Sequence, residues 1–413
     1  MTDAADLVLL DQDSYYQDPM GLFARLRESR PVAPARLPDL GRVWIITRYT
    51  DVRAALTDPR LANKPHPQPA GRQSIPGGAA GVHALLNIDP PDHTRLRRLV
   101  QKAFTPRRAA QLRPRTAEIA ASLLDQMTAG GDVVDLLGSY ARPLPITVIS
   151  ELLGIPVTER EWIWVTVTDY GKGGGELQRV PQELGAYFAR LITAKRAEPG
   201  NDLLSALVAA HDSANEDGVE AALTATELLS AAYHLVMAGF DTTVNLIASG
   251  ALALLTHPEE MARLQQDPSL LPAAVEELLR FTTPVNHVTP RFATEDLPIG
   301  DVVIPAGEPV LIATSSADRD PAQFPDPDRL DLGRDTSGHV AFGHGLHYCL
   351  GAPLARMEAE VAIGALLTRF PGISLAVSPE ELRWRPVSLM NGLESLPVRL
   401  ASTDNLQSRP SIR

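Results

Sequence analysis

The residues with the clearest capacity for chemistry lie in one short stretch, from Phe342 to Gly351. It contains Cys349, the only cysteine among 413 residues, together with glycines and two histidines. The segment that begins with Ala352-Pro353 is expected to be a helix to about Phe370, because proline is favoured in a first helical turn. Cys349 would then precede a helix N-terminus, where unpaired N–H groups and the helix dipole favour a thiolate. The stretch is therefore interpreted as a loop that presents an anionic sulfur.

Four kinds of site are compatible with such a cysteine. A buried structural cysteine is the usual case, although the glycine- and histidine-rich surroundings disfavour it here. A zinc site could use His339, His344 and His347 as well, but their spacing is not typical of zinc ligands. A nucleophile would need a base and an orienting partner. A haem-iron ligand would place the thiolate on one face of the iron and leave the other face for chemistry.

A second unusual segment lies within a long apolar helix. Thr224 and Glu227 have the spacing of a capping box, and the apolar pattern continues to about Thr256. Midway, the run from Ala238 to Thr243 contains glycine, aspartate and two threonines, which are poor helix formers. Threonine can also bond back to the helix backbone and bend it. The run indicates either a tolerated irregularity or a helix that opens to form a polar site.

The rest of the pattern predicts a mostly helical chain with a small β part. A loop rich in proline and glycine is expected over residues 60–89, and residues 171–175 form a glycine-rich joint that would suit a moving lid. Glu277 and Arg280 lie three positions apart on one helix face and could form an ion pair. Helices are expected over residues 14–30, 49–56, 93–196 with interruptions, and 272–281, and strands at 43–47 and between 284 and 332.

The composition excludes some classes of function. The formal net charge of −12 argues against general nucleic-acid binding, which needs a basic face. A single cysteine cannot form an intrachain disulfide, which fits a reducing compartment. The first thirty residues lack the layout of a signal sequence, and no lipid-facing apolar span is visible. A soluble, cytoplasmic protein without a membrane anchor is therefore expected.

Taken together, these segments resemble the cytochrome P450 monooxygenases. The spacing Phe342-x-x-Gly345-x-x-x-Cys349-x-Gly351 resembles the cysteine-ligand signature of that family. The resemblance runs from about residue 10 to residue 400 and is closest to the soluble bacterial members that oxidise polyketides and macrolides. Other positions that resemble family motifs are the Glu277/Arg280 pair, the oxygen-activation run Ala238 to Thr242, the pair His93 and Arg97, and the single residues Arg291 and His347.

The resemblance implies a fold and a cofactor. The fold would be mostly α with a small β part, with haem b between the long central helix and the cysteine loop. One domain would span residues 1–401, with a disordered tail at 402–413, and the protein would be a monomer. Cys349 would ligate the iron, and Glu277 and Arg280 would be structural. The residues expected to bind the cofactor are His93, Arg97, Gly239, Arg291, Phe342, Gly343, His347, Cys349 and Gly351.

The resemblance also implies a catalytic pair, Asp241 and Thr242. Thr242 would hold a water or donate a hydrogen bond on the side of the haem opposite the cysteine, and Asp241 would relay protons from solvent. The leading hypothesis is an enzyme that activates O2 and hydroxylates or epoxidises its substrate. The alternatives are a haem-binding sensor without turnover and a peroxide-driven enzyme of the same fold, neither of which needs this pair.

The substrate is expected to be a neutral, largely apolar natural product of medium size. No Asp or Glu lies between Arg60 and Asp89, so a cationic substrate would lack a carboxylate partner in that loop. The residues expected to line the pocket are mostly apolar: Leu85, Leu86, Leu235, Ala238, Val285, Val288, Leu389 and Met390.

The electrons are expected to come from a separate ferredoxin with its ferredoxin reductase, because no flavin or nicotinamide fingerprint is visible in the chain. A local basic patch in an otherwise acidic chain is the expected docking surface for that small acidic donor. The patch comprises Arg95, Arg98, Lys102, Arg107, Arg108 and Arg356.

Overall fold

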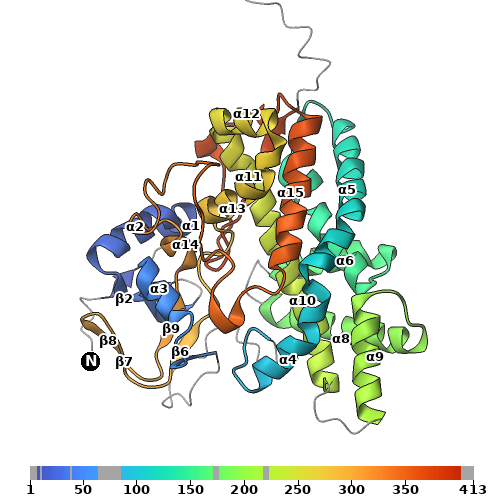
Figure 1. Ribbon diagram of the computed structural model, residues 1–413, viewed down its shortest axis with the longest axis horizontal. Coiled ribbons are helices and arrows are strands. Elements are labelled where there is room, and N and C mark those ends of the chain that lie inside the picture. The colour runs from blue at the N-terminus through green and yellow to red at the C-terminus, as the bar shows by residue number, and fades with distance from the viewer. Residues whose placement is uncertain are drawn as a thin grey trace, which may run out of the picture.

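The computed structural model describes residues 7–9, 12–37, 40–63, 85–170, 176–216 and 223–400. Most of the loop expected at 60–89, the joint expected at 171–175 and the tail expected at 402–413 lie outside the described residues. The predicted fold class is confirmed, because the described chain is mostly helical with a smaller β part (Figure 1).

The helices form the larger part of the molecule (Figure 1). Their bounds are α1 Gln12–Gln17, α2 Pro19–Ser29, α3 Tyr49–Ala55, α4 Asp92–Val100, α5 Pro106–Thr128, α6 Pro143–Leu153, α7 Arg160–Tyr170, α8 Glu176–Ala197, α9 Leu203–Glu216, α10 Ala225–Gly239, α11 Asp241–Thr256, α12 Pro258–Gln266, α13 Leu271–Thr282, α14 Thr314–Ala317 and α15 Ala352–Arg369. Short helical turns include η2 Gln101–Phe104 and η6 Gly345–His347.

The strands gather mainly at one side of the helical part (Figure 1). A six-stranded sheet has the order β1 (Val8–Leu9), β2 (Val32–Leu37), β3 (Gly41–Ile46), β9 (Pro309–Ile312), β6 (Arg291–Ala293) and β4 (Leu61–Ala62). Two smaller sheets join β10 (Ser374–Leu375), β11 (Pro397–Arg399) and β5 (Val133–Asp135), and β7 (Leu297–Ile299) with β8 (Val302–Ile304). In the large sheet β6 runs antiparallel to both β9 and β4, which brings the chain near residue 61 beside the chain near residue 292.

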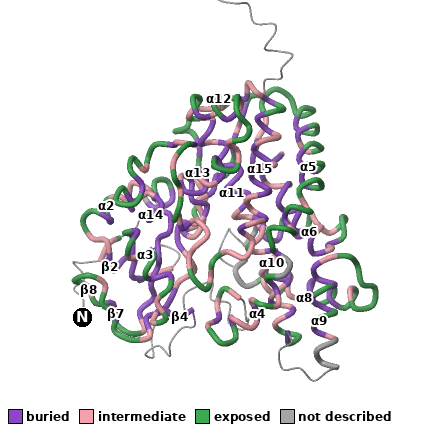
Figure 2. Tube along the Cα trace, in the orientation of Figure 1, coloured by how far each residue is buried: buried purple, intermediate pink, exposed green. Residues whose placement is uncertain are grey.

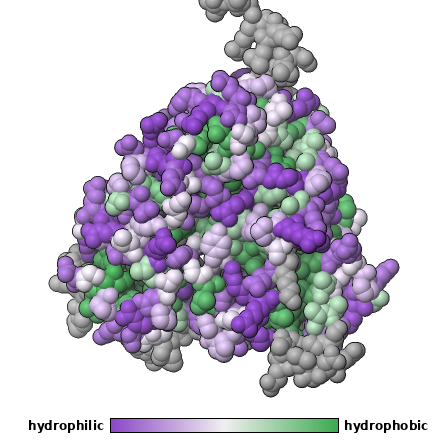
Figure 3. All heavy atoms as spheres, in the orientation of Figure 1, coloured by the Kyte–Doolittle hydropathy of each residue, from purple (hydrophilic) through white to green (hydrophobic). Residues whose placement is uncertain are grey.

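The core is centred on α11, which packs against α13 and α15, while α15 also packs along α5. Every residue of α11 from Thr243 to Ala251 is buried, and Figure 2 shows this interior position. Polar residues cover most of the face seen in Figure 3, with small apolar areas between them. By length and composition, one described helical stretch, Ala225–Thr256, could cross a membrane, but 61% of its most apolar window is buried inside the protein. It is therefore explained as the core helix.

The long central helix is interrupted, as the sequence predicts. Thr224 and Glu227 form both hydrogen bonds of the capping box at its start. The interruption falls at Phe240, which separates α10 from α11 and has φ −119° and ψ −53°. Phe240 is itself buried, so the interruption is held by the core and does not arise at the surface.

The helix predicted over residues 14–30 is wrong in one respect. The chain forms two helices there, α1 and α2, which are separated at Asp18. The Asp18 carboxylate accepts a hydrogen bond from the Gly21 N–H at 2.9 Å, and Pro19 follows it directly. Aspartate before proline is a strong signal for a helix start, which outweighs the continuous apolar spacing.

Helix α13 carries a fully buried ion pair. The Glu277 carboxylate accepts hydrogen bonds from Arg280 Nε and Nη2 at 2.7 and 2.8 Å, and the Arg334 guanidinium lies 3.2 Å away. Arg280 Nη1 donates to the carbonyl oxygens of Asp318 and Pro327, both at 2.9 Å. The pair thus joins α13 to the irregular segment 318–335 that precedes the cysteine loop.

The neighbouring residue on α13, Glu276, holds the other side of the same loop. Its carboxylate accepts hydrogen bonds from Nε and Nη2 of Arg356 on α15, at 2.5 and 2.8 Å. It also lies 2.9 Å from His339 Nε2. Burial opposes ionisation of Glu276, but these partners outweigh burial and hold its pKa at about 2. The Arg356 guanidinium also lies over the Phe342 ring, 4.6 Å from its centre.

We expect Glu277→Gln to lower the free energy of unfolding by about 3–5 kcal/mol, because it leaves the Arg280 charge buried without a counter-charge. The measurement is the midpoint of denaturant unfolding, followed by circular dichroism. The matched control is Glu183→Gln, which breaks an exposed pair with Arg179 on α8 and should cost less than about 1 kcal/mol. Equal effects of the two substitutions would contradict the central position assigned to Glu277.

Candidate functional site

The loop before α15 has the compact geometry that its glycines allow. Gly343 and Gly345 have φ of +71° and +76°, a region that side chains disfavour. A Cβ on Gly345 would also lie 2.8 Å from Thr57 Cγ2. The Cys349 N–H donates to the Phe342 carbonyl oxygen at 2.9 Å, which closes the loop. A Cβ on Gly351 would stand 3.9 Å from Cys349 Sγ, so glycine at this position leaves the space beside the sulfur open.

Burial and the local hydrogen-bond donors act in opposite directions on the Cys349 thiol. Burial raises the pKa of Cys349 above its ordinary value, although the N–H groups of Gly351 and Ala352 and the charges of Arg97 and Arg356 act in the opposite direction. The predicted donors are therefore present, but desolvation outweighs them. A cation bound to the sulfur would be needed to keep the thiolate.

Four basic residues from three segments, α4, η6 and β6, meet beside this loop. The rings of His93 on α4 and His347 on η6 have centroids 4.1 Å apart. Arg97, one turn after His93, donates to the carbonyl oxygen of Tyr348 at 2.7 Å. Arg291 on β6 is buried and donates to the carbonyl oxygen of Leu61 at 3.3 Å. The structure thus brings together all the positions expected to bind cofactor carboxylates.

Asp89 offsets the charge of this basic cluster only in part. Burial lowers the pKa of His93, Arg97 and Arg291, and burial followed by the charge of Arg291 lowers the pKa of His347 to about 3. Both ring nitrogens of His93 and Nε of Arg291 are buried and make no hydrogen bond among the described residues. Buried polar atoms without partners are costly, so the cluster fits a bound group that carries anionic oxygens.

The break in the central helix presents a second set of polar residues. Thr242 Oγ1 donates to the Ala238 carbonyl oxygen at 3.0 Å, four residues back, which is the backbone contact expected for threonine at a helix irregularity. Ala238 is exposed, and Asp241 and Thr242 are half-buried, whereas the following turns of α11 are buried. The face that carries Ala238 and Thr242 is therefore accessible within an otherwise buried helix.

Sequence reasoning missed the partner of Asp241. Arg385 Nη2 donates to Asp241 Oδ2 at 3.0 Å and to Asn245 Oδ1 at 3.1 Å. The Arg385 N–H also donates to the Gly392 carbonyl oxygen at 2.8 Å, and a Cβ on Gly392 would lie within 2.7 Å of both Asn245 Oδ1 and Arg385 Nη2. No local pattern marks this pairing, because 144 residues separate Arg385 from Asp241.

Gly239 has a packing explanation. A Cβ at this position would lie 3.2 Å from Ile149 Cδ1 on α6. Glycine therefore permits the close approach of α10 to α6. This contact gives a packing reason for glycine at position 239, and its expected place at the cofactor stays a prediction.

The structure describes all eight residues expected to line a substrate pocket. Val285 forms a bridge with Met390, and the Leu389 carbonyl oxygen accepts from the Asn286 N–H at 2.9 Å. Val288 is half-buried against the core of the sheet, whereas Leu86 is exposed. Leu85 and Leu235 pack as half-buried residues against the helical core. Of the eight expected residues, Leu85 and Leu235 thus lie at the edge of the helical core and Val288 at the edge of the sheet core, and the pocket itself stays a prediction.

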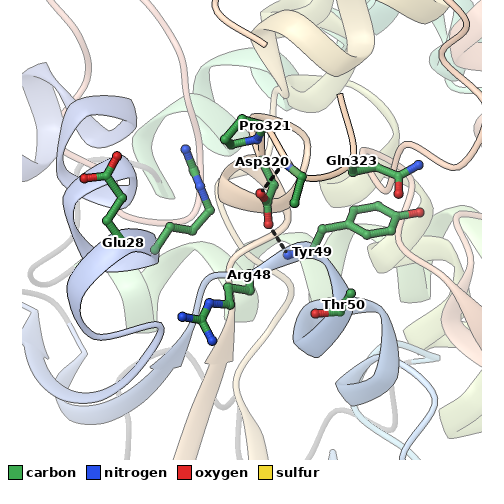
Figure 4. A pocket seen from close by; sticks show the side chains of 9 residues that line it. Glu28, Arg48, Tyr49, Thr50, Asp320, Pro321 and Gln323 are labelled. Atoms are coloured by element: carbon green, nitrogen blue, oxygen red, sulfur yellow. Dashed lines mark hydrogen bonds between the residues drawn. The ribbon is translucent and has the colours of Figure 1, made fainter. Parts of the chain in front are cut away.

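Two pockets of the described surface are lined by other residues. One is lined by Glu276, Tyr348, Arg356 and residues 336–339. The other lies between α3 and the segment after α14 (Figure 4), where the buried Asp320 carboxylate points at the first turn of α3 and accepts the Tyr49 N–H at 2.8 Å. These pockets contain ion pairs and caps that stabilise the fold.

The zinc alternative finds no support. His339 is engaged with Glu276, and His347 lies against His93. Within the described ranges, no group of three or more His, Cys, Asp or Glu side chains could hold a metal ion. A single cysteine beside a basic cluster remains, which fits a cofactor that carries both its own metal and its own carboxylates.

Comparison with known proteins agrees with this arrangement. The family model for cytochrome P450 matches residues 172–386. The cytochrome P450 monooxygenase PikC of Streptomyces venezuelae is 47% identical over 401 residues, covering 95% of this chain and 94% of the relative. The mycinamicin IV hydroxylase/epoxidase of Micromonospora griseorubida is 44% identical, covering 92% of this chain and 94% of the relative. The tirandamycin C-bound P450 monooxygenase TamI has a TM-score of 0.86 at 45% identity and covers 95% of this chain and 100% of that structure.

Proposed function

The chain belongs to the cytochrome P450 family of haem-thiolate monooxygenases, and we propose that it hydroxylates or epoxidises a neutral, largely apolar polyketide or macrolide. The observation that carries this proposal is the meeting of three features: a single cysteine, a basic cluster whose charge Asp89 offsets only in part, and an opened central helix with an acid and an alcohol. The relatives whose names specify polyketide or macrolide substrates support the substrate class.

The haem is bound through the thiolate of Cys349, the only cysteine in the chain. When bound, the haem supplies oxygen activation. His93, Arg97, Arg291 and His347 would hold its carboxylates, since the two guanidiniums are charged and buried nitrogens of His93 and Arg291 make no hydrogen bond among the described residues. The backbone N–H groups of Gly351 and Ala352 would donate to the sulfur and limit its basicity.

Asp241 and Thr242 would deliver protons on the opposite face. Asp241 is the first residue of α11, and its side chain is half-buried. Its carboxylate would therefore be able to exchange protons with solvent on one side and with the interior of the helix break on the other. Arg385 holds the Asp241 carboxylate in an ion pair through a 3.0 Å hydrogen bond. Asp241 could therefore change its rotamer only if the Arg385 guanidinium moves with it or the hydrogen bond breaks. Thr242 would exchange its bond with the Ala238 carbonyl oxygen for a water or a substrate oxygen.

The ion pair between Asp241 and Arg385 also affects which substrates can bind. Because Asp241 is paired with Arg385, it is not available to neutralise a cationic ligand. The segments expected to contact substrate are otherwise contributed by Leu, Val, Ala and Met side chains. A protonated amine would therefore lose its hydration without gaining a carboxylate.

The electron donor would be a ferredoxin that docks on the basic surface near α4. The structure changes the expected patch, because Arg95 pairs with Glu227 and Arg356 pairs with Glu276. Arg98 and Arg107 are exposed, and the side chain of Lys102 lies outside what the structure describes. Leu346 and Tyr348 on the cysteine loop are also exposed, which supports a contact surface beside the haem.

The substrate proposal predicts a preference between matched ligands. A neutral macrolide aglycone should bind at least about tenfold tighter than the same scaffold carrying a protonated amino sugar, because the described residues expected to line the pocket offer the amine no carboxylate and Asp241 is paired with Arg385. The measurement is a titration of the ferric protein that follows the blue shift of the Soret band. Tighter binding of the cationic ligand would refute the neutral-substrate proposal and leave the monooxygenase assignment intact.

The proton-delivery proposal predicts that Arg385→Leu lowers the product formed per reductant consumed by about tenfold, because Asp241 loses its fixed position. The assay uses a ligand found in the Soret titration and measures product and hydrogen peroxide together. The matched control is Arg383→Leu, an exposed arginine two residues away, which should leave the ratio unchanged. Equal ratios for both variants would exclude a role for Arg385.

The docking proposal predicts that Arg98→Glu slows reduction of the haem by ferredoxin several-fold at low salt and less at high salt, because the contact is electrostatic. The measurement is stopped-flow reduction, with the Soret titration as a check that ligand binding is retained. Arg25→Glu on α2, also an exposed arginine, makes the same charge change elsewhere. A reduction rate for Arg98→Glu equal to that of Arg25→Glu would contradict docking near α4.

A further inference from the structure

Asn63, a residue that neither the sequence motifs nor the cluster of basic side chains includes, contacts the haem-carboxylate site from strand β4. It follows Ala62 at the end of β4 and is 7% exposed. Its backbone N–H donates to the Asp89 carboxylate at 3.0 Å, and its side-chain Nδ2 donates to Asp89 Oδ1 at 2.8 Å. The same Nδ2 lies 3.0 Å from His347 Nε2.

These contacts determine which atom is the donor. A carboxylate only accepts hydrogen bonds, so the amide atom that faces Asp89 must be Nδ2 and not Oδ1. Nδ2 has two hydrogens, of which one is used by Asp89. The second is left for His347 Nε2, which must then be the accepting nitrogen. A neutral imidazole that accepts at Nε2 carries its proton on Nδ1.

The same strand also holds a second member of the cluster. The Leu61 carbonyl oxygen, two residues before Asn63, accepts the hydrogen bond from Arg291 Nη1. Strand β4 pairs with β6, which carries Arg291, in the register Leu61 to Ala293 and Ala62 to Phe292. Two of the four basic residues are thus placed by one short strand, through a carbonyl oxygen and through an amide.

We propose that Asn63 is a positioning residue of the haem-carboxylate site, which holds His347 as the Nδ1–H tautomer and so makes Nδ1 the donor available to a haem carboxylate. This inference rests on the proposed role of the basic cluster. The Nε2–H tautomer would turn its only N–H against the Asn63 amide and leave an acceptor nitrogen for an anion. Asp89 keeps the amide in the orientation that excludes this tautomer.

The tautomer can be measured directly in the haem-loaded wild-type protein. We expect two-bond proton–nitrogen correlation spectra of the ferrous carbon monoxide form, labelled with nitrogen-15 histidine, to show His347 protonated at Nδ1 and accepting at Nε2. The His347→Phe variant identifies the signal. An Nε2–H tautomer in the wild type overturns the proposal, and this result does not depend on whether any Asn63 variant folds.

The consequence for the cofactor is tested by haem transfer to excess apomyoglobin. We expect Asn63→Leu to release haem about three- to tenfold faster, the factor supplied by one neutral hydrogen bond. The matched control is Thr294→Val, which removes a 3.1 Å bond to the Arg60 carbonyl oxygen beside the same strand and touches none of the four basic residues. Its release rate should equal that of the wild type.

This assay tests the role of the basic cluster and the role of Asn63 separately. If His347→Phe does not speed haem release, the basic cluster does not hold the haem carboxylates and the proposed site is wrong. If His347→Phe speeds release but Asn63→Leu behaves like Thr294→Val, the cluster stands and the role of Asn63 is refuted.

Discussion

Two adjacent carboxylates on α13 hold the region around the cysteine in place. Glu277 faces the segment before the cysteine loop through Arg280 and Arg334, and Glu276 faces α15 and His339. Neighbouring positions on a helix point about 100° apart, so one turn of α13 reaches both flanks of the loop. Because the Glu277 pair is fully buried, its loss would leave a charge in the core. The geometry around Cys349 therefore depends on a network that takes no part in the chemistry.

The two faces of the proposed haem site differ in how far the protein balances their charges. On the cysteine side, four basic residues lie close together without enough acidic partners, so they favour a cofactor that brings anionic groups. On the opposite side, the Asp241 charge is already matched by Arg385. The first arrangement gives affinity for the cofactor. In the proposed site, the second would place an acid whose charge is already paired near the reacting position, which is consistent with an apolar substrate.

The large sheet also holds residues of the proposed site. Strand β6 carries Arg291, strand β4 accepts its hydrogen bond at Leu61, and Asn63 extends the same strand to His347. The short strand β4 lies immediately before the loop expected to contact substrate. In the proposed site, Leu61 and Asn63 would therefore support the residues that hold the cofactor carboxylates, through a backbone carbonyl oxygen and a side-chain amide.

The sequence by itself determined the features that are local in the chain. Glycine at Gly343 and Gly345, the capping box at Thr224 and the poor helix formers near Phe240 act within a few residues, so the loop, the helix start and the interruption were predictable. Tertiary structure decided which distant side chains meet. Arg385 lies 144 residues from Asp241 and Asn63 lies 284 residues from His347, and no spacing rule links them. The pKa of Cys349 also depends on folding, because burial, which only packing produces, outweighs the local N–H groups.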